Sequence, residues 1–275
     1  MNILFLGDLV GERSFKFVTL NIKSIIEKYN ITLVVVNGEN ISNGYGLKPQ
    51  HCEGLFEAGV DVITSGNHIW DQVSIIPYIA RNSNLIRPYN YKDHNPGSGY
   101  GIFEDKNGKK ILVANFICNV FMRSSDSPFA AASKLLDKYK LNENCDGILI
   151  DIHGETSSEK QAFANMLDGR VSAVLGSHTH VPTSDLRILP NGTAFITDAG
   201  MCGDYDSVIG GEKISWIGKF LTKENNVKIN SSSKNSTLCG IIIRISQKTG
   251  LSDVARQIIL GDVLENKIPS NKYFV

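Results

Sequence analysis

The stretch Ser65-Gly66-Asn67-His68-Ile69-Trp70-Asp71 joins a short apolar run to a segment of helical character. The run before it, at residues 60–64, is typical of a strand buried in a parallel sheet. Asn67 and His68 are therefore expected where a strand ends, which is the edge at which ligands bind in open α/β sheets. An amide oxygen beside an imidazole can serve a metal ion and a proton transfer. We expect the rest of the chain to supply partners for this pair.

The N-terminal part of the chain alternates strands and helices. Strands are expected at residues 3–6, 31–36 and 60–64, and helices at about 13–29, 49–58 and 72–81. Pro49 is well placed to begin the second helix, whereas Pro77 should kink or shorten the third. This β-α-β-α-β-α order predicts a parallel sheet with right-handed crossovers.

The rest of the chain adds hairpin signals to further strand and helix patterns. Hairpins are expected at 99–116, 187–196 and 239–260, strands at 147–151 and 171–175, and helices at 128–140 and 157–167. The polar segment 225–235 is expected to be a mobile loop. Parallel and hairpin-connected strands together favour two mixed sheets that face each other, with helices outside, over a single doubly wound sheet. No linker separates two domains, so residues 1–275 are expected to form one.

The composition bounds the classes of function. The chain has 275 residues, 28 Lys and Arg against 28 Asp and Glu, and a net charge of zero, which argues against holding long nucleic acid by bulk electrostatics. It does not exclude a small anionic substrate. Five scattered cysteines without a C-x-x-C pair indicate reduced thiols in the cytoplasm. No apolar run reaches the ~18 residues of a membrane span, and the N-terminal run lacks the basic flank of a signal peptide.

Six side chains with metal-binding groups lie at or just past the ends of expected strands. They are Asp8, Glu39, Asn67, His153, His178 and His180. Carboxylate, imidazole and amide oxygen together suit Fe, Mn or Zn better than Ca²⁺. If two ions sit together, Glu39 is the natural bridge between them. His178 and His180, two apart in an extended segment, would point to one side.

Each of these residues alone has a simpler interpretation. Asp8 could be a helix N-cap, Glu39 and Asn67 turn residues, and His153 a structural or surface side chain. The ordered set is harder to explain by folding alone. The other two histidines, His51 and His94, lack such placement and are expected at the surface.

The order of these motifs resembles the calcineurin-like metallophosphoesterases. The motifs are Gly7-Asp8, Gly38-Glu39-Asn40, Gly66-Asn67-His68, His153 and Gly176-x-His178-x-His180. In that superfamily an acidic residue commonly follows Gly-Asn-His directly, whereas here Ile69 and Trp70 intervene before Asp71. The bacterial YmdB-like branch is similar over nearly the full length, through residues 37–40, 65–71, 197–203 and 205–207.

The resemblance implies a four-layer α/β/β/α sandwich with a two-metal centre that hydrolyses phosphodiesters. By motif, one metal takes Asp8, Glu39 and His180, and the other takes Glu39, Asn67, His153 and His178. The superfamily usually has a histidine two residues after the first Asp, but Val10 stands there and cannot bind a metal. Either Asn40 or a water fills that place. The branch is associated with iron or manganese, and zinc also suits the ligands.

The resemblance also suggests a mechanism and a substrate. A hydroxide bridging the metals attacks phosphorus in line, and His68, which is not a ligand, protonates the leaving oxygen, with Asp71 orienting its ring. YmdB-like proteins act on 2′,3′-cyclic nucleotides, which is the first expected substrate. The segment 199–203 could approach a phosphate or base, or be a tight structural turn.

Two alternatives stay open. The same site could serve a phosphomonoesterase or a nuclease. The protein could also act as a regulatory binding partner in RNA turnover, with hydrolysis secondary. No sequence motif decides whether the chain forms a homo-oligomer.

Overall fold

The computed structural model describes residues 1–91, 95–122, 124–222 and 229–274. Its first sheet has five strands in the order β13-β12-β1-β3-β4. The strands are β1 (Asn2–Leu6), β3 (Leu33–Asn37), β4 (Val62–Thr64), β12 (Thr237–Ile245) and β13 (Ser252–Gly261). β1, β3 and β4 run parallel, and the β12–β13 hairpin joins β1 in antiparallel pairing. The sheet is therefore mixed, as expected.

The second sheet has six strands in the order β5-β6-β7-β8-β10-β9. They are β5 (Tyr100–Glu104), β6 (Lys110–Ile117), β7 (Gly147–His153), β8 (Ala173–Ser177), β9 (Arg187–Ile188) and β10 (Ala194–Ile196). β6, β7, β8 and β10 are parallel, whereas β5 and β9 close antiparallel hairpins at the two edges. All three hairpins that the sequence predicts are confirmed.

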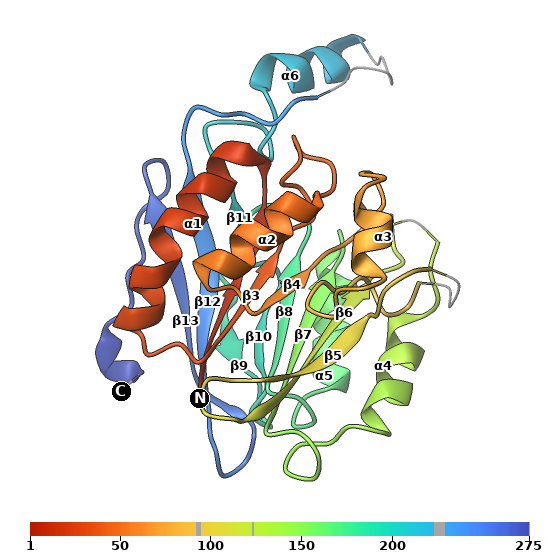
Figure 1. The fold of residues 1–275 in the computed structure, drawn as a ribbon, viewed down its shortest axis with the longest axis vertical. Helices are drawn as coiled ribbons and strands as arrows, with labels where there is room; N and C mark the ends of the chain where they lie inside the picture. Colours follow the sequence, from red (N-terminus) through yellow and green to blue (C-terminus); the bar gives the residue numbers. More distant parts are fainter. Residues whose placement is uncertain (92–94, 123, 223–228, 275) are drawn as a thin grey trace.

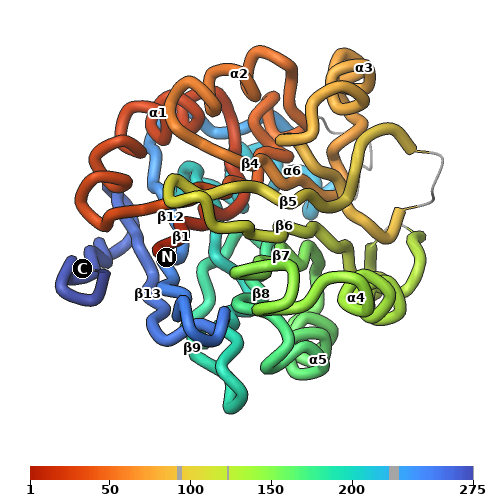
Figure 2. The backbone as a smooth tube through the Cα atoms, turned by 60° about the horizontal axis from the view of Figure 1, so that its bottom comes forward, coloured from red at the N-terminus to blue at the C-terminus, as the bar shows by residue number. Residues whose placement is uncertain are grey.

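Helices cover the outer faces of both sheets. They are α1 (Gly11–Lys28), α2 (Pro49–Ala58), α3 (Ile75–Ile79), α4 (Pro128–Leu136) and α5 (Ser157–Met166). Figures 1 and 2 show α1, α2 and α3 on one side of the paired sheets and α4 and α5 on the other. The predicted four-layer α/β/β/α sandwich is confirmed.

Side chains that point to opposite faces of the strands contribute to three apolar cores. In β1, Ile3 and Phe5 point into the core between the sheets, while Leu4 and Leu6 point toward the helices α1 and α2. Successive strand side chains face opposite ways, so a β-branched run can serve two cores at once. A third core lies between the second sheet and α4 with α5. The strands are thus fixed on both faces, and their carboxyl ends are held at one edge.

Several local expectations differ from the structure. α2 begins at Pro49, as predicted, but α3 is reduced to Ile75–Ile79 around Pro77. A sixth helix, α6 (Lys213–Thr222), was not predicted. Of the segment 225–235, residues 225–228 lie outside the described residues, and 229–235 contain no helix or strand beyond an isolated bridge. His94, expected at the surface, also lies outside the described residues.

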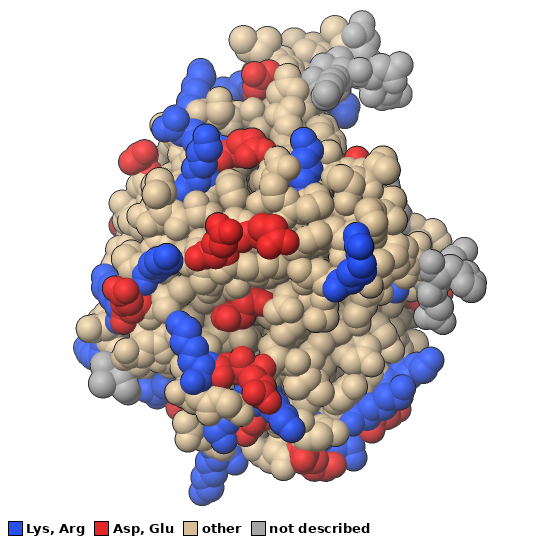
Figure 3. All heavy atoms as spheres, viewed as in Figure 1, with Lys and Arg blue, Asp and Glu red and all other residues tan. Residues whose placement is uncertain are grey.

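The surface and the helices bear on the classes of partner. On the face drawn in Figure 3, Lys and Arg are interspersed with Asp and Glu among the described residues. That face offers no single-sign field for a long polyanion. Among the described helices, none combines the length and apolar character needed to cross a membrane. All five cysteines are buried and free.

Candidate metal centre

Polar side chains from both sheets meet at the carboxyl ends of the parallel strands. Asp8 lies in β2 (Asp8–Leu9), which follows β1 and pairs with β11 (Met201–Cys202). Glu39 follows β3 and Asn67 follows β4, while His153 ends β7. His178 and His180 follow β8. The structure therefore gathers the strand-end residues as the sequence predicts.

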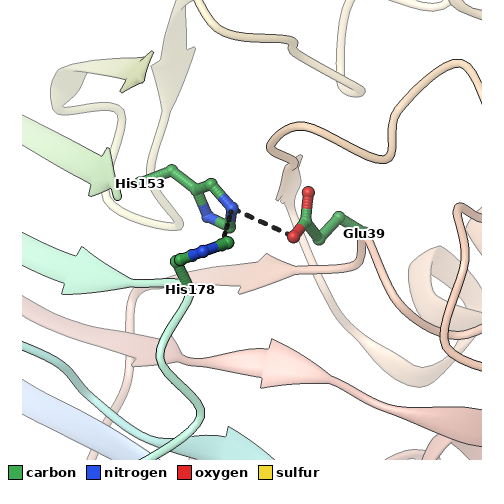
Figure 4. Close-up of side chains that lie close together, drawn as sticks. All are labelled: Glu39, His153 and His178. Carbon is green, nitrogen blue, oxygen red and sulfur yellow. Dashed lines mark hydrogen bonds and ion pairs between the residues drawn. The ribbon is translucent and has the colours of Figure 1, made fainter. Parts of the chain in front are cut away.

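His153 is the centre of this cluster. Its Nε2 lies 3.0 Å from Glu39 Oε1, 3.1 Å from Asn67 Oδ1 and 3.0 Å from His178 Nδ1. Glu39, His153 and His178 each offer a ligand atom, and these atoms lie within 4.8 Å of one another. Figure 4 shows the Glu39 carboxylate and the His178 ring turned toward the same nitrogen of His153. Two imidazoles and a carboxylate that converge in this way suit a transition-metal ion.

A buried carboxylate behind His153 fixes the tautomer of its ring. Ser177 Oγ donates to Asp151 Oδ1 at 2.6 Å, and Thr64 Oγ1 donates to Asp151 Oδ2 at 2.5 Å. Because the single hydroxyl proton of Ser177 is used in this way, its oxygen accepts from His153 Nδ1 at 3.0 Å. In the neutral ring, Nε2 then keeps its lone pair and can bind a metal.

The electrostatics of the cluster also favour a cation. Burial alone would lower the pKa of His153, but Glu39 and the other carboxylates outweigh it and raise it to about 9. Burial would raise the pKa of Glu39, yet His153 lowers it to about 2. Burial, with the charge on His153, lowers the pKa of His178 to about 3. The site thus holds one positive charge between buried groups, and a metal ion can take the place of that proton.

Two predicted ligands carry buried oxygens that lack a hydrogen-bond partner among the described residues, and one of them, Asp8 Oδ1, lies 3.7 Å from His153 Nδ1. Asp8 Oδ2 accepts from the His178 main-chain N–H at 2.9 Å, but Asp8 Oδ1 has no hydrogen-bond partner among the described residues. Asn40 Nδ2 donates to Gly44 O at 3.0 Å, which leaves Asn40 Oδ1 equally unpartnered within the described chain. Buried oxygens of this kind are costly unless something binds them. Both residues therefore fit a metal ion.

The segment that carries His178 and His180 has an unusual backbone. His178 has φ 103° and His180 has φ 65°, so both lie in the left-handed region. The expected extended conformation is therefore wrong, whereas both rings do face one side, because they border the same cavity. His180 Nδ1 lies 2.7 Å from the Ile209 carbonyl oxygen. Such strain persists only where surrounding contacts enforce it.

A buried ion pair provides contacts that hold the backbone conformation of this segment. Lys160 Nζ donates to Ser177 O at 2.6 Å and to Asp198 Oδ2 at 3.0 Å. Asp198 in turn accepts from the main-chain N–H of Thr179 at 2.9 Å and from that of Gly200 at 2.9 Å. The ion pair is thus hydrogen-bonded to the main chain on both sides of His178, at Ser177 and Thr179.

His68 lies beside the cluster and faces the cavity. Its main-chain N–H donates to Glu39 Oε2 at 3.1 Å, and its Nδ1 lies 2.7 Å from Asp71 Oδ2. The ring of Tyr45 packs edge-on against it, with centroids 5.4 Å apart. The expected contact between Asp71 and His68 is therefore present, and Nε2 is the nitrogen left to face a substrate.

Gly66 lets the chain pass close to the cluster. A Cβ at this position would lie 2.3 Å from both Glu39 Oε2 and His153 Nε2. Any side chain here would displace two of the three converging groups. Only glycine therefore fits at this position of the Gly-Asn-His motif without a steric clash.

A cavity of about 400 Å³ opens over the cluster. Its floor includes Glu39, Asn40, His68, His178 and His180. This volume lies within the ~300–1,000 Å³ typical of small-molecule sites. The cavity can hold a mononucleotide-sized ligand against the cluster.

Three simpler expectations can be compared with the structure. His51 is buried and not at the surface; Glu12 Oε1 lies 2.8 Å from its Nε2, and the Lys48 N–H donates to its Nδ1 at 3.0 Å. Asp8 is not the N-cap of α1, since Val10 holds that position. Segment 199–203 includes β11; none of its residues, all described, borders this cavity, whereas Met201 borders a neighbouring one together with His180.

Sequence reasoning missed the residues that support the cluster. Asp151, Lys160, Ser177 and Asp198 are fully buried polar residues. Asp151 lies inside the apolar strand β7, and a charge in such a run is the one signal that could have revealed it. Lys160 in α5 gave no such signal, because its partners come from distant parts of the chain.

The order of elements and the cluster together define a metallophosphoesterase-like fold with a metal-binding strand edge. Residues 4–258 match the family model described as YmdB-like protein. A 2′,3′-cyclic-nucleotide 2′-phosphodiesterase of Bacillus subtilis is 38% identical over 95% of this chain and 98% of its own length. The crystal structure of a novel phosphatase from Mycoplasma pneumoniae matches with TM-score 0.89 and 34% identity, over 99% of this chain and 96% of that one.

The crystal structure of a hypothetical protein from Thermus thermophilus is also similar. It has TM-score 0.88 and 35% identity, and covers 95% of this chain and 100% of that one. The chain belongs to the YmdB-like family, which confirms the resemblance found in the sequence. With relatives named a phosphodiesterase and a phosphatase, the predicted enzyme class, a phosphoesterase, is also confirmed.

Proposed function

We propose that this protein is a two-metal phosphodiesterase that hydrolyses 2′,3′-cyclic nucleotides. One observation carries the proposal. Glu39, His153 and His178 converge beside the unpartnered oxygens of Asp8 and Asn40, with His68 next to them at the floor of one cavity. Two-metal hydrolysis of a phosphodiester uses clustered ligands for the ions together with an adjacent proton donor.

The ligands divide into two sets that share Glu39. Asp8, Asn40 and His180 would complete the first set, and Asn67, His153 and His178 the second. The unpartnered Oδ1 of Asn40 supports Asn40, in preference to a water alone, as the replacement for the histidine that Val10 lacks. Oxygen and imidazole ligands without thiolate favour iron or manganese, and accommodate zinc.

When bound, the two ions would activate a water as the nucleophile and neutralise charge on the phosphoryl oxygens. The chain itself positions the groups around them. The Ser177–Asp151 pair keeps the proton of neutral His153 on Nδ1, and the Lys160–Asp198 pair holds the His178–His180 loop.

His68 is the proposed general acid. Asp71 accepts from Nδ1 and orients the ring, so Nε2–H can donate to the oxygen that leaves phosphorus. The adjacent main-chain bond to Glu39 keeps the ring beside the cluster without making it a ligand.

Hydrolysis of a 2′,3′-cyclic nucleotide can break the bond from phosphorus to O2′ or the bond to O3′. The relative from Bacillus subtilis is named a 2′-phosphodiesterase, so its reaction leaves the phosphate on the 3′-oxygen. For this chain we propose the same outcome. Hydroxide adds to phosphorus, the P–O2′ bond breaks, and the His68 proton passes to O2′. The product is a nucleoside 3′-phosphate.

The test combines metal analysis with product identification. The purified protein is expected to contain up to two metal ions per chain and to convert 2′,3′-cyclic AMP to adenosine 3′-phosphate. p-Nitrophenyl phosphate and a short RNA serve as competing substrates. Preferential hydrolysis of the monoester or internal cleavage of RNA would overturn the proposal.

Buried free cysteines also support a cytoplasmic location, which fractionation would test.

A further inference from the structure

The helix α6 projects over the strand edge that carries the metal cluster (Figure 1). None of its ten described residues is buried. Ile214, Phe220 and Leu221 are exposed to solvent, whereas Trp216 and Lys219 are partly covered and border the cavity over the cluster. Residues three apart share one helix face, so Trp216 and Lys219 are presented together.

The loop before α6 and two neighbours in the helix hold Trp216 at the cavity. A Cβ on Gly211 would lie 2.5 Å from Trp216 Nε1, so only glycine lets the indole lie this close to the loop before α6. Lys219 Nζ lies 5.1 Å from the indole centroid, a cation–π contact. Phe220 stacks on the indole with centroids 5.8 Å apart and planes 21° apart. The ring is thus held in place although the helix is otherwise exposed.

Tyr45 contributes a second aromatic ring to the same cavity. It packs against His68, and its carbonyl oxygen accepts from Gln72 Nε2 at 2.7 Å. The loop that carries Tyr45 is tied to the chain that follows α6. Asn43 Nδ2 donates to Asn230 Oδ1 at 3.0 Å, and Ser231 N–H donates to Asn43 Oδ1 at 3.1 Å. Two aromatic residues from distant segments therefore border one enclosure.

We propose that Trp216, Lys219 and Tyr45 form a nucleobase subsite above the metal cluster. This inference rests on the proposed function, because it assigns the place of the base once the cyclic phosphate lies at the cluster. Aromatic rings bind the flat faces of bases, and a lysine near them favours an anionic nucleotide. The ~400 Å³ cavity suits a mononucleotide. Stacking accepts every base, so purines and pyrimidines should both bind.

The test separates base recognition from catalysis. The steady-state kinetics of 2′,3′-cyclic AMP are compared with those of methyl riboside 2,3-cyclic phosphate, which has the same reacting group without a base. Replacing Trp216 by Leu should raise the KM for 2′,3′-cyclic AMP about tenfold with little change in kcat, since stacking is worth a factor of this order. Trp216→Phe should restore most of the affinity. Ile214→Ala, an apolar truncation on the exposed face of α6, should behave as the wild type.

A binding measurement makes the test independent of turnover. Calorimetry should show adenosine 3′-phosphate binding the wild type more tightly than ribose 3-phosphate, and Trp216→Leu should lose about tenfold of that preference. If the wild type fails to hydrolyse 2′,3′-cyclic AMP but keeps this preference, the proposed function fails and the subsite stands. If Trp216→Leu keeps the wild-type preference in both measurements, the nucleobase subsite is wrong whatever the substrate.

Discussion

The ammonium group of Lys160 lies 3.0 Å from Oδ2 of Asp198, and both side chains are fully buried beneath the loop that carries His178 and His180. Removing one partner leaves the other charge buried without compensation. Lys160→Met should therefore lower the free energy of unfolding by about 3–5 kcal/mol. Lys109→Met, which breaks a pair whose two side chains are each 37% exposed, should cost at most about 1 kcal/mol. Equal denaturant midpoints for the two variants would contradict the role assigned to Lys160.

The same pair predicts a dependence on pH. Burial raises the pKa of Asp198, but Lys160 and hydrogen bonds outweigh it, so the pKa is lowered. A lowered pKa contributes stability that is full above the unfolded value, about 3.9, and is lost as pH falls further. The stability gap between wild type and Lys160→Met should narrow below about pH 4. Chemical denaturation at pH 3 and pH 7 measures it, and a gap that widens in acid would refute the assignment.

Gly66→Ala should abolish metal binding. The new methyl group would lie 2.3 Å from Glu39 Oε2 and from His153 Nε2, closer than real Cβ atoms approach other atoms, so both must shift. Elemental analysis should find loss of metal from this variant. Gly218→Ala provides the control, because nothing lies within 4 Å of the added Cβ. A metal-replete Gly66→Ala would show that the cluster tolerates the displacement.

His68→Ala should keep its metal and lose most of its turnover. The bond to Glu39 comes from the main chain and survives the substitution, whereas the proton donor is removed. General acid catalysis contributes roughly 10²–10⁴-fold, so kcat should fall within that range. Metal content and kcat are measured on the same sample. Loss of metal in step with activity would make His68 a ligand instead.

His178→Ala should lose a metal ion. Its Nδ1 points to the same place as His153 Nε2, so the substitution removes one of three converging ligands. The measurement is the number of ions per chain at limiting metal concentration. A variant that binds metal as the wild type does would rule out His178 as a ligand.

Asn40→Ala should weaken the binding of the other metal ion, which Asp8 and His180 would also hold. Its Oδ1 is buried and lacks a partner among the described residues, and Val10, beside it in an isolated bridge, offers no ligand. Adding Val10→His to Asn40→Ala supplies an imidazole at the position where the superfamily carries one, and should recover metal content. If Asn40→Ala alone binds two ions with unchanged affinity, a water fills the place.

Much of this architecture could be predicted because its signals are local. β-Branched runs identified the buried strands, and Pro49 located the start of α2. Parallel strands place their carboxyl ends at one edge, so strand-end residues such as Glu39 and His153 could be expected to meet. The strands and the start of the helix are each determined by the hydrophobic periodicity and the turn residues of a short stretch of sequence.

The features that escaped prediction depend on contacts between distant segments. The left-handed backbone at His178 and His180 is held by Lys160 and Asp198, which lie 38 positions apart. The buried His51 has its Nε2 2.8 Å from Glu12, which comes from another helix. α6, none of whose described residues is buried, was also not predicted. For the three histidines the deciding partner is not a neighbour in sequence.

The cluster draws its groups from both sheets, with Glu39 following a strand of the five-stranded sheet and His153 ending a strand of the six-stranded one. An ion held by both would cross-link the two halves of the sandwich. Melting temperature would then rise with the concentration of free metal by mass action, since the unfolded chain lacks the assembled site. A chelator would lower it. The heat resistance of the fold would thus report how well the cell supplies the enzyme with metal.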